Sequence, residues 1–149
     1  MLMPHSANQL LAKALNGALD AAPAAGSAGP GDAAGVDTRH FTDRVERDAA
    51  IQRFAYSTEA CWKAAQSVLS IQFGLELGSP KSVIRSCAQN ALLAETDARL
   101  AMELVDDRNL TSHTCNESLT QAIWSRLPAH LAVMQRWMAA LERVTASSL

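Results

Sequence analysis

Residues 116–141 read NESLTQAIWSRLPAHLAVMQRWMAAL, and this stretch decides the fold class. Its large apolar side chains recur in steps of three and four residues, the spacing that places them on one face of an α-helix. They are Leu119, Ile123, Trp124, Leu127, Leu131, Met134, Trp137, Met138 and Leu141. Asn116 is suited to cap the start of the helix. Pro128 is expected to kink the helix because it lacks an N–H donor.

The same spacing predicts a second long helix upstream of this stretch. It should begin near Asp37 or Thr38, either of which can cap it, and end at Gly74. A shorter helix should follow from Ser79 and Pro80, because a serine cap followed by proline is a favoured helix start. Its apolar face is formed by Val83, Ile84, Cys87, Ala88, Ala91 and Leu92.

Two further helices complete the expected set. One begins around residues 96–97 and contains Leu100, Met102, Leu104 and Val105. The other spans Asn8 to Ala22, and an Ala/Gly/Pro-rich segment from Pro23 to Val36 follows it as a flexible connector. No segment alternates with the period of two that a strand requires. The sequence therefore predicts an all-α fold, an antiparallel up-and-down bundle of four to five helices, as a single domain over residues 1–149.

Composition narrows the class of protein. Lys and Arg total 13 against 15 Asp and Glu, so the net charge of −2 does not indicate a nucleic-acid or membrane partner, and any RNA contact must be local. The three cysteines, Cys61, Cys87 and Cys115, contain no C-x-x-C pair and fit neither a disulfide framework nor a zinc site. We expect no signal peptide, no membrane span and a cytoplasmic location.

Residues 106–115 read DDRNLTSHTC and contain the candidate catalytic pair, Arg108 and His113. Histidine titrates near neutral pH, and the planar guanidinium of arginine matches phosphate oxygens. On a straight helix, positions five apart point about 140° away from each other. The pair can converge if the arginine side chain reaches round the helix, if the helix loosens before Asn116, or if a second subunit completes the site. Such residues can also simply cap the end of a helix.

A second cluster contains Glu59, Trp62 and Lys63 within the long upstream helix. Its interpretation as one core tryptophan flanked by solvated charges is as well supported as a binding role. The histidines His5, His40 and His130 are expected to be solvated or to cap helices. Asp106 and Asp107 are expected to orient the Arg108 guanidinium.

Three segments together resemble a known family. They are residues 48–63, DAAIQRFAYSTEACWK, residues 78–85, GSPKSVIR, and residues 106–113, DDRNLTSH. In this order they resemble the nucleotidyltransferase substrate-binding protein family, the HepT-like branch of the HEPN superfamily. The resemblance implies a homodimeric helical bundle encoded beside a minimal nucleotidyltransferase. It implies a toxin–antitoxin pair in which the HEPN protein is a metal-independent ribonuclease that cleaves RNA and the nucleotidyltransferase neutralises it.

The family's Arg-x4-His motif falls on Arg108 and His113, with Asn109 as the polar residue after the arginine. The resemblance implies that His113 is the acid or base, that Arg108 contacts the phosphate and its transition state, and that Asn109 positions the phosphate or His113. No cofactor and no metal ion is expected. The alternative is a non-catalytic substrate-binding subunit of a two-component nucleotidyltransferase.

The candidate cleft for a partner or substrate adds Ser112 and Cys115 to Glu59, Trp62 and Lys63. Cys115 stands where the family carries a tyrosine that accepts AMP, so that acceptor is missing. Neutralisation through complex formation, or through another acceptor such as Ser112 or Thr114, stays open.

Overall fold

The computed structural model describes residues 36–113 and 116–147, which form helices joined by short connections and contain no strand. The elements are α2 (Val36–Phe73), α3 (Pro80–Gln89), α4 (Glu95–Leu110), the short 3-10 helix η1 (Thr111–His113) and α5 (Glu117–Ser147). The all-α class is confirmed, with four packed α-helices in this part of the chain. The expected helix Asn8–Ala22 and the connector up to residue 35 lie outside the described residues. The extent of the single domain stays a prediction.

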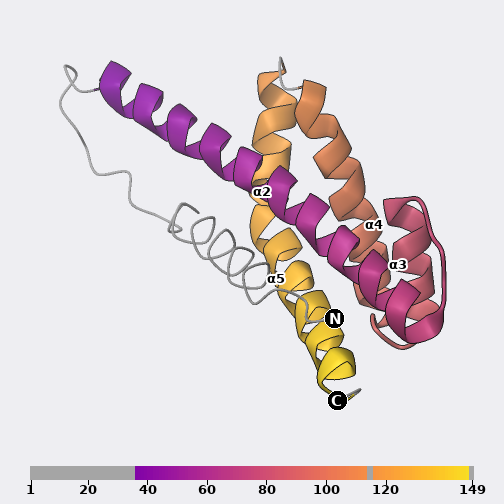
Figure 1. Cartoon of the computed structure of the whole chain (residues 1–149). Coiled ribbons are helices and arrows are strands. Elements are labelled where there is room, and N and C mark those ends of the chain that lie inside the picture. Colours follow the sequence, from indigo (N-terminus) through magenta and orange to yellow (C-terminus); the bar gives the residue numbers. More distant parts are fainter. Residues whose placement is uncertain (1–35, 114–115, 148–149) are drawn as a thin grey trace.

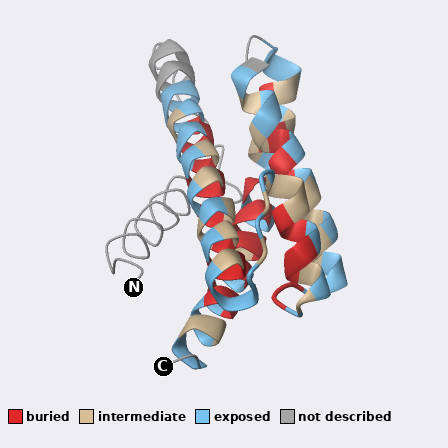
Figure 2. Cartoon of the chain, turned by 45° about the vertical axis from the view of Figure 1, so that its right-hand side comes forward, coloured by how far each residue is buried: buried red, intermediate tan, exposed pale blue. Residues whose placement is uncertain are grey.

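The two longest helices, α2 and α5, cross and contact each other (Figure 1). Helix α3 packs against α2 and α4, and α4 packs against both long helices. Buried residues lie on the inward faces of the helices, whereas exposed residues cover the outside (Figure 2). Each of the four helices contributes fully buried apolar side chains to one continuous core, among them Phe54, Ile84, Leu104 and Trp137.

Local sequence signals explain where α2 ends and α3 begins. Gly74 stops α2 with a φ of 65°, a left-handed conformation that glycine adopts without a Cβ clash. Ser79 caps α3 because its hydroxyl accepts a hydrogen bond from the Ser82 N–H at 3.2 Å, and Pro80 takes the first helical position. Both expectations are confirmed.

Helix α4 begins at Glu95, one residue earlier than expected, and Ala94 at its N-cap makes no side-chain hydrogen bond. Glu95 and Asp97 lie in the first turn instead, where carboxylates interact favourably with the positive end of the helix dipole. The α-helix ends at Leu110 and the chain tightens into η1.

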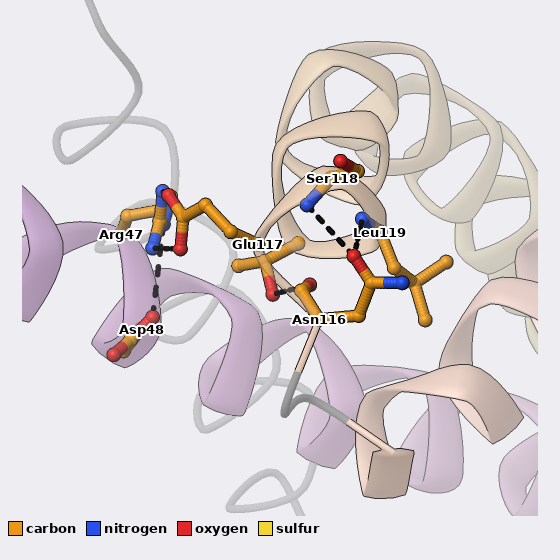
Figure 3. A network of polar contacts seen from close by, with 7 residues as sticks. Arg47, Asp48, Asn116, Glu117, Ser118 and Leu119 are labelled. Carbon is orange, nitrogen blue, oxygen red and sulfur yellow. Dashed lines mark hydrogen bonds and ion pairs between the residues drawn. The ribbon is translucent and has the colours of Figure 1, made fainter.

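Helix α5 confirms the stripe from which the fold was predicted. The carboxamide oxygen of Asn116 accepts hydrogen bonds from the N–H groups of Ser118 and Leu119 at 3.0 and 3.3 Å, so the expected cap is confirmed (Figure 3). The helix runs unbroken through Pro128, and the kink expected there stays a prediction. Seven of the nine stripe residues are buried, and the other two are partly buried against the core.

Candidate functional site at the C-terminal end of α4

Three successive side chains at the end of α4 contact three different helices. Asp106 pairs with Lys81 of α3 at 2.7 Å. Asp107 contacts α5 through Arg126 and His130. Arg108 pairs with Glu59 of α2 at 2.7 Å. Neighbouring residues on a helix point about 100° apart, so the last turn of α4 directs one side chain toward each surrounding helix. The expectation that Asp106 and Asp107 orient the Arg108 guanidinium is therefore wrong, because Glu59 orients it.

The Arg108 guanidinium is half-buried and only partly engaged. Its Nη2 lies 2.7 Å from Glu59 Oε1, and the two side chains are 36% and 29% exposed. Its Nη1 donates a long hydrogen bond of 3.4 Å to Asn109 Oδ1. Its Nε is buried and has no partner among the described residues. Because a guanidinium has five N–H donors, Arg108 keeps donors for an additional acceptor such as a phosphate oxygen.

The chain tightens after Leu110, two residues beyond Arg108. The hydroxyl of Thr111 donates to the Arg108 carbonyl at 2.6 Å, and the hydroxyl of Ser112 donates to the Asn109 carbonyl at 2.9 Å. Each 3-10 residue turns the chain by about 120° instead of about 100°, so η1 leaves positions 108 and 113 about 160° apart around the axis. The loosening considered before Asn116 is not found up to His113. The side chain of His113 and residues 114–115, including Cys115, lie outside the described residues.

Asp107 forms a buried polar network with α5. Its carboxylate, in a residue only 5% exposed, accepts hydrogen bonds from Arg126 Nε and Nη2 at 2.7 and 2.8 Å and from His130 Nε2 at 2.7 Å. The ring of His130 stacks on Phe54 of α2, with ring centroids 5.4 Å apart. Burial by itself raises the pKa of Asp107, but the hydrogen bonds from Arg126 and His130 outweigh burial and leave the pKa lowered.

The expectation that His130 is solvated or caps a helix is wrong, because the residue is 2% exposed. Its position contains a signal that could have predicted this. His130 follows Leu127 by three residues and precedes Met134 by four, so it lies on the buried stripe of α5. A polar residue on a buried stripe requires a hydrogen-bonding partner, and Asp107 is that partner.

A second ion pair lies at the start of α5, directly after residues 106–115. The buried Arg47 of α2 donates to both carboxylate oxygens of Glu117, at 2.7 and 3.2 Å, and lies 3.7 Å from Asp48 (Figure 3). The hydrogen bond from Arg47 lowers the pKa of Glu117. Together with the Asn116 cap, this contact fixes the start of α5. Nothing in the sequence indicates that Arg47 and Glu117 are partners, because they lie 70 positions apart.

The described residues of the predicted cleft lie in different surroundings. Glu59 and Lys63 lie together near Arg108, because Lys63 Nζ is 3.8 Å from Glu59 Oε2. Trp62 is partly buried and packs against the core, which favours its structural interpretation. Ser112 is exposed. The role of this set as a partner or substrate cleft stays a prediction.

The described residues, 36–113 and 116–147, contain no group of three or more His, Cys, Asp and Glu side chains arranged to bind a metal ion. None of their helices combines the length and the apolar character needed to cross a membrane.

Comparisons with known proteins identify the family of this chain. A solved structure from Thermus thermophilus is 43% identical to this chain, with a TM-score of 0.72 over 88% of this chain and 98% of that one. A crystal structure of a toxin–antitoxin with AMP-PNP has a chain of similar fold, with 16% identity and a TM-score of 0.64 over 91% of this chain and 95% of that one. No curated protein matches significantly. The family model described as "Nucleotidyltransferase substrate binding protein like" matches residues 10–143, and the chain therefore belongs to the nucleotidyltransferase substrate-binding protein family.

Proposed function

We propose that this protein is the HEPN-type toxin of a toxin–antitoxin pair, a metal-independent RNA endonuclease that a minimal nucleotidyltransferase neutralises. Membership of the family supports a nucleotidyltransferase partner. The fold similarity to a chain of a toxin–antitoxin structure with AMP-PNP supports the pairing as well. The observation that carries the proposal is the half-buried Arg108 in the last turn of α4, oriented by Glu59 and followed three residues later by the 3-10 turn that contains His113.

The chemistry follows from the residue types. His113 acts as the base that removes the proton from the ribose 2′-hydroxyl, or as the acid that protonates the leaving 5′ oxygen. Arg108 binds the phosphate and stabilises the charge that develops in the transition state. Asn109, which contacts Arg108 Nη1, helps to position the guanidinium or the phosphate.

Two copies of the chain complete the proposed site. Cleavage requires both an acid and a base, and this segment of one chain supplies one histidine. The 3-10 turn also leaves positions 108 and 113 on different sides of the axis. A two-fold dimer brings two copies of His113 together, so one residue supplies both functions.

The decisive experiment measures cleavage of a defined RNA in the presence of EDTA. Wild type is compared with His113→Ala and Arg108→Ala, and Arg99→Ala is the matched control. Arg99 also lies on α4 and pairs with a glutamate, Glu95, at 2.9 Å, but it is remote from the site. We expect cleavage by wild type and Arg99→Ala and its loss in the other two variants. An inactive wild type, or an active His113→Ala variant, would contradict the proposal. Light scattering tests the dimer, and a stable monomer would contradict the shared site.

One observation favours the alternative, a non-catalytic substrate-binding subunit of a two-component nucleotidyltransferase. Glu59 lies 2.7 Å from Arg108, so a phosphate approaching the guanidinium must compete with a carboxylate. If the wild type binds its nucleotidyltransferase partner but leaves RNA intact, this second function replaces the first.

A further inference from the structure

The buried network around Asp107 has no part in the proposed chemistry, yet it lies next to the proposed site. Asp107 directly precedes Arg108 in the chain, and its side chain contacts α5 while that of Arg108 contacts α2. We propose that Asp107, together with Arg126 and His130, is a positioning residue that fixes the rotation of the last turn of α4. This inference rests on the proposed function, because it assigns a role toward Arg108 and the turn that contains His113.

The geometry around Asp107 is suited to fixing a rotation. Arg126 donates two parallel hydrogen bonds, which define the plane of the carboxylate, and His130 donates a third. Side-chain ends lie about 5–6 Å from a helix axis, so a rotation of α4 by about 20° would move the Arg108 guanidinium by about 2 Å. A displacement of that size breaks the 2.7 Å contact between Arg108 and Glu59.

Among the three contacts at the end of α4, the Asp107 network is the best suited to this role. The Lys81 and Asp106 side chains are 44% and 56% exposed, and exposed ion pairs constrain geometry weakly. The Asp107 and His130 side chains are only 8% and 3% exposed. A buried carboxylate with three donors has few alternative arrangements, because any other leaves charged or polar groups without partners.

His130 extends the same constraint to α2. One ring nitrogen contacts Asp107 on α4, and the ring stacks on Phe54 of α2. Phe54 lies on the same helix as Glu59, five residues before it. The imidazole therefore connects the helix that carries Glu59 with the helix that carries Arg108, and it does so from within α5.

The chain contains a matched control. Asp97, in the first turn of α4, accepts hydrogen bonds from Arg136 Nε and Nη2 at 3.0 and 2.8 Å. This contact has the same bidentate arrangement and joins the same two helices, but it lies at the opposite end of α4 from Arg108. At a temperature where every variant is folded, a purely structural role for Asp107 predicts that Asp107→Asn leaves kcat unchanged, as Asp97→Asn does.

The test compares the kinetics of RNA cleavage by dimeric, full-length wild type, Asp107→Asn and Asp97→Asn at a temperature where all three are folded. Misplacement of a positioned group by about 1 Å can cost about 100-fold in rate, so we expect Asp107→Asn to lower kcat by about 10- to 100-fold. KM should rise by a smaller factor than kcat falls, because Arg108 binds the phosphate throughout but stabilises charge that develops only in the transition state, and Asp97→Asn should keep the wild-type kcat. Equal losses in the two variants, or no loss in Asp107→Asn, would overturn the inference. If Asp107→Asn does not fold, Arg126→Gln decides by the same criteria, because the Arg126 side chain is 43% exposed and its replacement leaves Asp107 with His130.

A spectroscopic measurement keeps this inference separate from the proposed function. The buried Nε–H of Arg108 gives an NMR resonance that can be assigned by its absence from Arg108→Lys. We expect Asp107→Asn, or Arg126→Gln if that variant is used, to shift this resonance and Asp97→Asn to leave it unchanged. If the wild type does not cleave RNA but the variants show this pattern, the proposed ribonuclease activity is wrong and the positioning role of Asp107 stands. An unshifted resonance in the decisive variant would overturn the positioning role even if the wild type cleaves RNA.

Discussion

Phe54 offers the sharpest test of how the core supports the site, because its ring is fully buried and also stacks on His130. Truncation of a buried phenylalanine to alanine lowers the free energy of unfolding by about 3–5 kcal/mol, because apolar burial is lost and a cavity remains. Phe54→Leu keeps most of the volume and loses chiefly the ring stacking, so its cost should be about 1–1.5 kcal/mol. For a chain of this size, Phe54→Ala should lower Tm by about 10 °C.

The assay is urea unfolding followed by tryptophan fluorescence, to which the buried Trp137 should contribute. Ile71→Ala is the control, because Ile71 lies on the same helix but is 65% exposed, and such a change usually alters stability by about 0.5 kcal/mol or less. If Phe54→Ala lowers the free energy of unfolding no more than Ile71→Ala, the packing described around His130 is wrong. If Phe54→Leu costs as much as Phe54→Ala, the separation of stacking from cavity formation is wrong.

Three further predictions concern assembly, acid stability and backbone conformation. Wild type and His113→Ala are mixed in equal amounts and refolded together, so that about one quarter of the dimers contain two wild-type chains. The mixture should retain about one quarter of the wild-type cleavage rate if both His113 residues of a dimer serve one site. A rate of about one half would show that each copy acts alone. Burial raises the pKa of Asp107, but hydrogen bonds from Arg126 and His130 outweigh burial and leave the pKa below its ordinary value of 3.8. The ionised carboxylate therefore stabilises the folded protein above pH 3.8, and this stabilisation is lost as the pH falls through the lower pKa of the folded state. The urea midpoint of wild type should therefore fall more steeply than that of Asp107→Asn below about pH 4, and parallel curves would contradict the network. Gly74→Ala should lower the free energy of unfolding by about 1–2 kcal/mol through the positive φ alone, since nothing lies within 4 Å of the added Cβ. Gly78 is equally open but has no positive φ, so Gly78→Ala should lower it much less in the same unfolding assay.

The parts of the fold that depend on neighbours in sequence could be predicted. The caps at Ser79 and Asn116 and the stop at Gly74 are local, because each requires only the backbone within a few residues. The apolar stripe of α5 was predicted for a similar reason, since helical spacing depends on one segment alone.

The polar contacts around the site could not be predicted in this way. Spacing tells which face of a helix is polar but not which residue lies opposite in the fold. Glu59 and Arg108 were both singled out, yet their contact joins helices that are far apart in sequence. Asp107 and His130 were misinterpreted because each was assessed against its neighbours in sequence, whereas the partner of each lies on another helix.

The Arg47–Glu117 contact has a consequence for the order in which the molecule assembles. Its residues are 70 positions apart, whereas the packing of α3 on α4 joins segments that are close in sequence. Contacts between distant segments require closure of a long loop and tend to form late, so docking of α5 onto α2 should complete folding. Residues 106–113 would then reach their final surroundings only in that last step. Under the proposed function, a nascent or partly folded chain would be harmless to cellular RNA, and toxicity would begin only with the finished fold.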